Sequence, residues 1–309
     1  MSRSLPGWVV VAACGLSGVT PGAPAPAAAE QGTTFEAGGV TLWYEVRGSG
    51  TGTPLIVANG GPGFDHTYLH CSDAWDRLAK NRRVVFYDQR GNGRSSKLKP
   101  NQPCGLAEQI ADLEALRARL GYAKIDLLGH SWGGYLVMAY TARYPDRVAH
   151  LLIVDSAAPK IQDTVFLFKN IYPETTDRQN AVAFAVELGE ASAISADLRE
   201  YLSMLFYSPE VRDAFLAKAS SFQYRQEVNK LVWNDLQRFD LNPELRKLKM
   251  PTLVITGRYD FNVAPSVAWA IHSSIPGSEI AIFERSGHLP FCEEVDAFVA
   301  RVERFLTKP

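Results

Sequence analysis

One short run of residues limits the possible folds of this chain more than any other feature. Residues 129–134 read Gly-His-Ser-Trp-Gly-Gly, between an apolar run at 125–128 and a helical pattern that ends before Pro145. A serine in Gly-x-Ser-x-Gly between a strand and a helix is typical of a sharp turn that exposes the serine hydroxyl. The turn is so tight that a Cβ atom two residues before or after the serine would clash. We therefore predict that Ser131 is a nucleophile; the alternative is a plain turn whose serine caps the helix.

Short apolar runs elsewhere predict the sheet that such a turn requires. They are residues 55–58, 84–87, 125–128, 151–154, 252–255 and 280–283. Most are unbroken by polar residues, as in strands buried on both faces of a parallel sheet. A strand pair at 33–37 and 40–46 precedes them, and helical patterns follow at 106–120, 134–144 and 295–306. Strands that alternate with helices predict an α/β fold with a mostly parallel sheet flanked by helices.

The alternation stops over residues 157–240. This stretch holds helix-like segments at 179–190, 196–206 and 210–232, and strand patterns return only at Thr252. In a parallel sheet, a helical insertion after one strand lies over the carboxyl edge, where such folds bind ligands. We therefore expect an α/β core of residues 30–156 and 241–309, interrupted by a helical lid of residues 157–240.

A nucleophilic serine needs a base, and the base needs an acid that orients it. Asp260 and His288 each follow a predicted strand at its carboxyl end. The order Ser131, Asp260, His288 along the chain matches a known order of such triads. Asp155, which also follows a strand, is the alternative acid, although capping the entry to the lid would explain it too.

An acyl-transfer site also needs backbone N–H groups aimed at the negative charge that develops on the substrate oxygen. Trp132, the residue after the serine, supplies one of them. Residues 59–63 read Asn-Gly-Gly-Pro-Gly and follow a predicted strand, and glycines there let the backbone approach a substrate. We expect Gly61 to supply the second N–H; the alternative is an ordinary glycine turn.

These motifs resemble those of the α/β-hydrolases, and among them the prolyl aminopeptidases (proline iminopeptidases). Besides residues 59–63 and 129–134, residues 88–95 read Asp-Gln-Arg-Gly-Asn-Gly-Arg-Ser, which is similar to the family's Asp-Gln-x-Gly-x-Gly-x-Ser. The resemblance runs from Thr33 to the C-terminus except for the lid. It implies that the protein releases an N-terminal residue, often proline, from short peptides.

Two features depart from the family pattern. Asn59 stands where the family has histidine, so the hydrogen bonding of this loop must differ. The family also has acidic lid residues that hold the free amino group of the substrate, and Glu187, Glu190, Glu200 and Glu227 are the candidates here. None of them lies in a matching motif, and a solvated helix face explains each of them too.

The N-terminus predicts export to the periplasm or the cell exterior. Arg3 is the only charge before Glu30, and an apolar stretch runs from Trp8 to about Val19. That stretch is too short to span a bilayer. A basic start, a short apolar run and a small-residue site are typical of a signal at residues 1–29 that is cleaved after Ala29.

A second interpretation of this segment is a lipoprotein signal. Residues 11–14 read Val-Ala-Ala-Cys and resemble a bacterial lipobox, which would place a lipid anchor on Cys14.

Export also bears on the other cysteines. In an oxidising compartment Cys71 and Cys104 can pair; inert thiols are the alternative. Cleavage beyond Cys14 leaves three cysteines, so at least one has no partner within the chain.

Composition and motifs exclude several classes of protein. The chain has 32 Lys+Arg and 33 Asp+Glu, so it lacks the basic excess of a nucleic-acid binder. It has no metal-ligand spacing and no nucleotide-binding glycine loop, so we expect no metal and no cofactor. The expected partner is a small molecule or a short peptide. A carboxylesterase or lactonase and, more remotely, a non-catalytic ligand-binding protein of the same fold are the alternatives.

Overall fold

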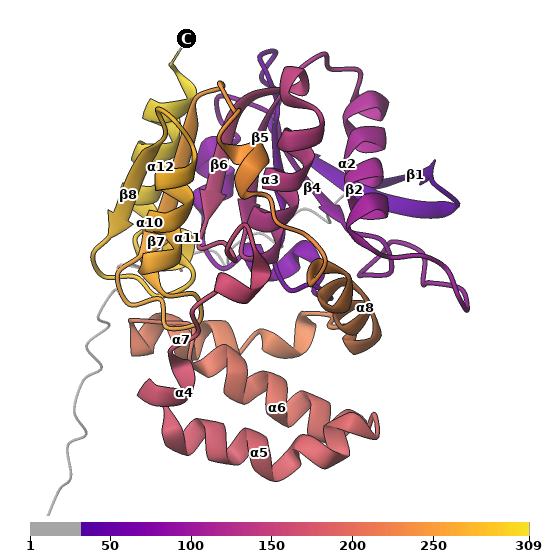
Figure 1. Cartoon of the computed structure of the whole chain (residues 1–309), viewed down its shortest axis with the longest axis vertical. Coiled ribbons are helices and arrows are strands. Elements are labelled where there is room, and N and C mark those ends of the chain that lie inside the picture. The colour runs from indigo at the N-terminus through magenta and orange to yellow at the C-terminus, as the bar shows by residue number, and fades with distance from the viewer. Residues whose placement is uncertain (1–31, 309) are drawn as a thin grey trace, which may run out of the picture. The chain divides into compact units, whose positions relative to one another are not determined.

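The computed structural model describes residues 32–308, whose strands form a single sheet (Figure 1). The strands are β1 (Thr33–Ala37), β2 (Val40–Arg47), β3 (Leu55–Ala58), β4 (Val84–Asp88), β5 (Ile125–His130), β6 (Val148–Val154), β7 (Thr252–Gly257) and β8 (Glu279–Phe283). Their order across the sheet is β1-β2-β4-β3-β5-β6-β7-β8. The β1–β2 and β2–β4 pairs are antiparallel, and the other pairs are parallel. The predicted α/β fold is confirmed.

Helices cover both faces of this sheet. One face packs against α2 (Leu106–Leu120), α3 (Trp132–Arg143), α9 (Asn242–Leu245) and α10 (Pro265–Ser274). The other packs against α1 (Ala74–Leu78), α11 (Pro290–Glu293) and α12 (Val295–Leu306). Every residue of β3, β4, β5 and β7 is consequently buried. Burial from both sides explains why these strands are apolar without alternation.

The ends of α2 follow from its sequence. At its start the N–H of Gly105 donates to the Glu108 carboxylate at 2.9 Å, which satisfies one of the unpaired groups of a helix terminus. At its end Gly121 takes the left-handed conformation, with a φ of 78°, which glycine adopts without steric cost. The predicted bounds of α2 and α12 are confirmed, whereas α3 begins two residues before the prediction.

Helices also fill the chain between β6 and β7 in the described residues. They are α4 (Phe168–Ile171), α5 (Pro173–Glu187), α6 (Ala191–Ser203), α7 (Pro209–Leu216) and α8 (Gln226–Leu236), followed by α9. In Figure 1 α5, α6 and α7 lie together beyond one end of the strands. The prediction of one helix at 210–232 is wrong, because residues 223–225 bond to the loop after β3 instead of continuing α7. Asp65 N–H donates to the carbonyl of Gln223 at 3.1 Å, and Arg225 N–H to that of Gly63 at 2.8 Å.

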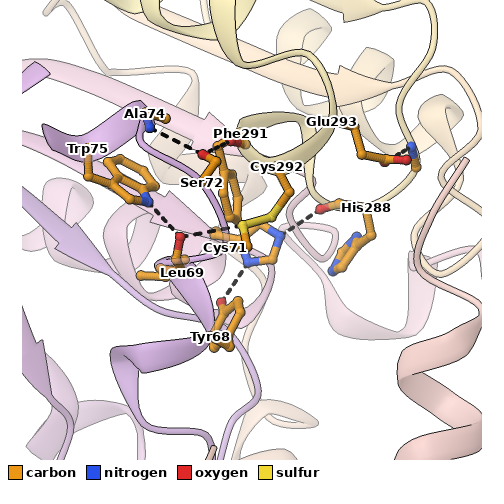
Figure 2. Close-up of a disulfide and its surroundings, with 12 residues drawn as sticks. Tyr68, Leu69, Cys71, Ser72, Ala74, Trp75, His288, Phe291, Cys292 and Glu293 are labelled. Carbon is orange, nitrogen blue, oxygen red and sulfur yellow. Dashed lines mark hydrogen bonds between the residues drawn. A yellow bond between two sulfur atoms is a disulfide. The ribbon is translucent and has the colours of Figure 1, made fainter. Parts of the chain in front are cut away.

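Cys71 and Cys292 form a disulfide, with their Cα atoms 5.6 Å apart (Figure 2). Of the two alternatives left open by the sequence, a Cys71–Cys104 pair is wrong, because the two residues belong to opposite faces of the sheet, and inert thiols are wrong for Cys71. Cys71 and Cys292 pack with the α1 and α12 side, whereas Cys104 packs with α2. Cys104 is a buried free thiol.

The predicted export signal at residues 1–29 and the lipid site at Cys14 lie outside the described residues. Within residues 32–308, no helix combines the length and the apolar character needed to cross a bilayer.

We expect the variant C71S/C292S to lose about 2–4 kcal/mol of its free energy of unfolding, because the disulfide restricts the unfolded chain. The two cysteines are separated by 221 positions, so the bond closes a long loop. Urea unfolding followed by circular dichroism measures the change, with Cys104→Ala as a control that keeps the disulfide. An unchanged unfolding midpoint in C71S/C292S would contradict this expectation.

Candidate active site

Ser131 lies where β5 turns into α3, with its backbone in an unusual conformation. Its φ is 58° and its ψ is −122°, which is costly for a residue that has a Cβ atom. The flanking glycines permit the turn. A Cβ on Gly129 would lie 2.1 Å from the carbonyl oxygen of Gly133, and one on Gly133 would lie 2.1 Å from that of Ala58. The predicted reason for both glycines is confirmed.

His288 and Asp260 meet at the carboxyl edge of the sheet. The Nδ1 of His288 and the Oδ2 of Asp260 are 2.7 Å apart, and both side chains are buried. The Oδ1 of Asp260 accepts from the backbone N–H groups of Asn262 at 2.9 Å and Val263 at 2.8 Å. Three N–H donors favour the carboxylate form of Asp260 and a histidine tautomer with its proton on Nδ1. The basic nitrogen of His288 is then Nε2.

Ser131 and His288 line the same small cavity, whose volume is about 20 Å³. In this structure the Nε2 of His288 accepts a hydrogen bond from the side-chain amide of Asn262 at 3.1 Å. This hydrogen bond occupies the lone pair with which Nε2 would accept a proton. Sequence reasoning missed Asn262, although its place two residues after Asp260 was the available signal.

The loop that carries His288 is held to the segment after α6. The backbone N–H of His288 donates to the carbonyl of Leu205 at 2.7 Å. The half-buried Glu293 carboxylate accepts from the N–H of Gly287 at 2.7 Å and from that of Tyr207 at 2.8 Å. These bonds fix the imidazole in place and couple it to the helices between β6 and β7.

A chain of hydrogen bonds joins the glycine loop to His288, and Figure 2 shows its part between Tyr68 and His288. The N–H of Gly60 donates to the Tyr68 hydroxyl at 2.6 Å, and that hydroxyl donates to Nδ1 of His130 at 2.7 Å. The Nε2 of His130 donates to the carbonyl of His288 at 2.8 Å. Burial, followed by the charge of His288, lowers the pKa of His130 well below its usual range, so this ring is neutral.

A second set of bonds shapes the glycine loop itself. The Asn59 amide donates to two carbonyls of the loop, at 3.0 and 2.9 Å. Gln89 donates to the carbonyl of Asn59 at 2.8 Å and accepts from the indole N–H of Trp132 at 2.8 Å. Gly61 and Trp132, the two expected oxyanion donors, both line the cavity beside Ser131.

This larger cavity has a volume of about 780 Å³. Seven of its lining residues are aromatic: Phe64, Trp132, Phe166, Phe168, Tyr201, Tyr224 and Trp233. The described lining includes one carboxylate, Asp197 of α6, and one ammonium group, Lys169. Asp197 accepts from the Gln179 amide at 2.9 Å. Burial raises the pKa of Asp197, and the bond from Gln179 lowers it by a smaller amount.

The structure does not bring the predicted lid glutamates to this cavity. Glu187 and Glu190 lie at the exposed turn between α5 and α6, and Glu227 is exposed at the start of α8. Glu200 pairs with Arg178 at 2.9 Å. Sequence reasoning missed Asp197, which lies in no motif and is identified only by the way α6 packs over the cavity.

A separate buried cluster joins Glu45, His66 and His70, which have potential ligand atoms within 4.8 Å of one another. Arg47 donates to the Glu45 carboxylate at 2.9 Å and contacts Nδ1 of His70 at 3.0 Å. Burial, and next the charge of Arg47, lower the pKa of His70 to about 2. A guanidinium group so placed disfavours a second cation, so these residues do not suit a metal ion.

Comparisons with known proteins place the chain in a family. The family model described as alpha/beta hydrolase fold matches residues 53–295. The proline iminopeptidase of Saccharolobus solfataricus is 31% identical over 281 residues, which cover 87% of this chain and 89% of that protein. The proline iminopeptidase of Heyndrickxia coagulans is 29% identical, covering 87% of this chain and 96% of that protein.

Solved structures with the same fold include esterases. An esterase from Exiguobacterium antarcticum superposes with a TM-score of 0.72 at 22% identity, and the match covers 90% of this chain and 100% of the esterase. A thermophilic esterase from Thermogutta terrifontis gives a TM-score of 0.69 at 25% identity, covering 89% of this chain and 98% of that one. The chain therefore belongs to the α/β-hydrolase family of enzymes, and within that family it is similar in sequence to the proline iminopeptidases.

Proposed function

We propose that this hydrolase acts through a triad of Ser131, His288 and Asp260. The Nε2 of His288 takes the proton of Ser131, whose oxygen attacks the substrate carbonyl. The N–H groups of Gly61 and Trp132 stabilise the oxyanion that forms. His288 then protonates the leaving group and activates the water that releases the acid. The 2.7 Å contact between His288 and Asp260 supports this assignment.

We further propose that the substrate is a short peptide with a free N-terminal residue of the proline type. The observation that carries this proposal is the Asp197 carboxylate in the lining of the Ser131 cavity. The α-ammonium group of a peptide would pair with that carboxylate and fix the first residue over Ser131. The aromatic walls suit the apolar proline ring. The similarity to proline iminopeptidases supports the same substrate.

A carboxylesterase or lactonase is the second candidate function. Several aromatic side chains line the cavity, and Lys169 lies in the lining together with Asp197. A small neutral ester would bind such a cavity without using the carboxylate. Esterases of the same fold and similar size favour this alternative, although the fold by itself does not choose between substrates.

We expect Asp197→Asn to raise the KM for prolyl-β-naphthylamide about tenfold or more, because a buried charge-assisted contact with the ammonium group is lost. The kcat/KM for p-nitrophenyl butyrate should stay within about twofold, since this ester has no ammonium group. Steady-state kinetics of both substrates in both proteins measure the difference. Glu190→Gln is the matched control, because it removes an exposed lid carboxylate outside the cavity.

Two outcomes would contradict the peptidase proposal. The first is hydrolysis of the ester alone, with no gain when the substrate carries a free α-amino group. The second is an equal effect of Asp197→Asn on both substrates, which would indicate a general disturbance of the cavity.

We also propose that the protein is exported. The disulfide between Cys71 and Cys292 supports an oxidising compartment. We expect the mature protein from its native host to begin at Glu30, or else to carry a lipid on Cys14. Intact-mass measurement of the purified protein distinguishes the two forms. A chain that still begins at Met1 would contradict export.

A further inference from the structure

A second buried aspartate lies behind the predicted triad. Asp155 follows the last residue of β6 and is 2% exposed, and its φ of 45° is unusual for a residue other than glycine. Its N–H donates to the carbonyl of Ile255 at 2.9 Å. Its Oδ1 accepts from the N–H of Gly257, also at 2.9 Å. The strained backbone and these two bonds to β7 fix the carboxyl group in one place.

Asp155 lies close to both Asp260 and His288. One carboxylate oxygen of each aspartate and a ring nitrogen of His288 lie within 4.8 Å of one another. Two buried carboxylates at this separation cannot both be charged without a large cost. Asp260 accepts three hydrogen bonds from N–H groups, whereas the buried Oδ2 of Asp155 has no donor among the described residues. The proton shared by the pair therefore belongs on Asp155.

The surroundings agree with a single negative charge on the pair. Burial, and next the charge of Asp260, raise the pKa of Asp155 well above its usual range. The other titratable groups that face the pair are His288 and Tyr201. His130 bonds to the backbone carbonyl of His288 and is linked to the pair through that residue. Burial lowers the pKa of His130 and raises that of Tyr201, so both are neutral near pH 7. His288 thus faces the negative charge of Asp260 alone.

We propose that Asp155 is a positioning residue whose carboxylic O–H donates a hydrogen bond to Asp260 and so extends the triad by one link. The same placement gives Asp155 a second capacity. When Asp260 is removed, Asp155 loses its proton and supplies the negative charge that stabilises protonated His288. This inference rests on the proposed triad, because it assigns Asp155 a role relative to His288.

The first test replaces Asp155 and asks whether this position carries a negative charge, which the acid limb of the pH profile reports. Asp155→Asn keeps one N–H donor for Asp260 and one carbonyl acceptor for Gly257, and it exchanges a neutral group for a neutral group. We expect its kcat/KM for p-nitrophenyl butyrate within about threefold of wild type, and the acid limb of the pH profile unchanged. Asp155→Ala should lower kcat on the order of tenfold, because the donor is lost. Ser156→Ala is the control, since the side chain of this buried neighbour donates to the adjacent carbonyl of Ala157 and, among the described residues, forms no bond to the triad.

The second test removes Asp260. Asp260→Ala avoids the amide that would favour the wrong tautomer of His288. We expect this variant to keep at least about tenfold more activity than D155N/D260A, in which neither position can carry a charge. Circular dichroism and thermal unfolding establish that each variant is folded.

A third measurement does not depend on catalysis. Infrared difference spectra between wild type and Asp155→Asn at pH 7 should show the loss of one protonated-carboxyl C=O band. This band difference between wild type and Asp155→Asn is expected even if Ser131 proves not to be the nucleophile. In that case only the proposed function fails.

Three results would overturn the inference about Asp155. They are the absence of that infrared band, an acid limb that moves to lower pH in Asp155→Asn, and equal activity of Asp260→Ala and D155N/D260A. A shift to lower pH would mean that a negative charge near His288 had been removed, and hence that Asp155 was ionised.

Discussion

The close packing of the Ser131 turn against neighbouring backbone is the constraint on which the rest of the site depends. The chain leaves β5 and enters α3 with Gly133 against the carbonyl of Ala58, so no side chain fits there. The last residue of β3 therefore borders the turn, and the glycine loop that follows β3 lies beside Ser131. The strained conformation of Ser131 is held by a sheet that is buried on both faces.

Hydrogen bonds then connect the parts of the site that come from distant segments. Tyr68 and His130 join the glycine loop to the backbone of His288, and Gln89 joins the same loop to Trp132. The disulfide between Cys71 and Cys292 ties the segment just after Tyr68 to the segment just after His288. The glycine loop and His288 are therefore fixed relative to each other by hydrogen bonds and by one covalent link.

The sequence predicted the features that depend on local pattern. The apolar runs identified the strands, and the glycines of residues 129–134 identified the turn, because each follows from burial or from backbone sterics. Features that depend on how distant segments pack were missed. Asp197 and the partner of Cys71 are defined by tertiary contacts, and the break between α7 and α8 arises from bonds to residues 63–65. The substrate-binding glutamates were expected from a resemblance that does not extend to the lid.

The site of covalent modification tests most directly whether Ser131 is the nucleophile, as we propose. The folded protein is treated with a fluorophosphonate probe, digested and analysed by mass spectrometry. We expect one adduct per chain on the peptide that contains Ser131, and none in Ser131→Ala. A folded wild-type protein that stays unlabelled, or an adduct at another residue that persists in Ser131→Ala, would contradict this proposal.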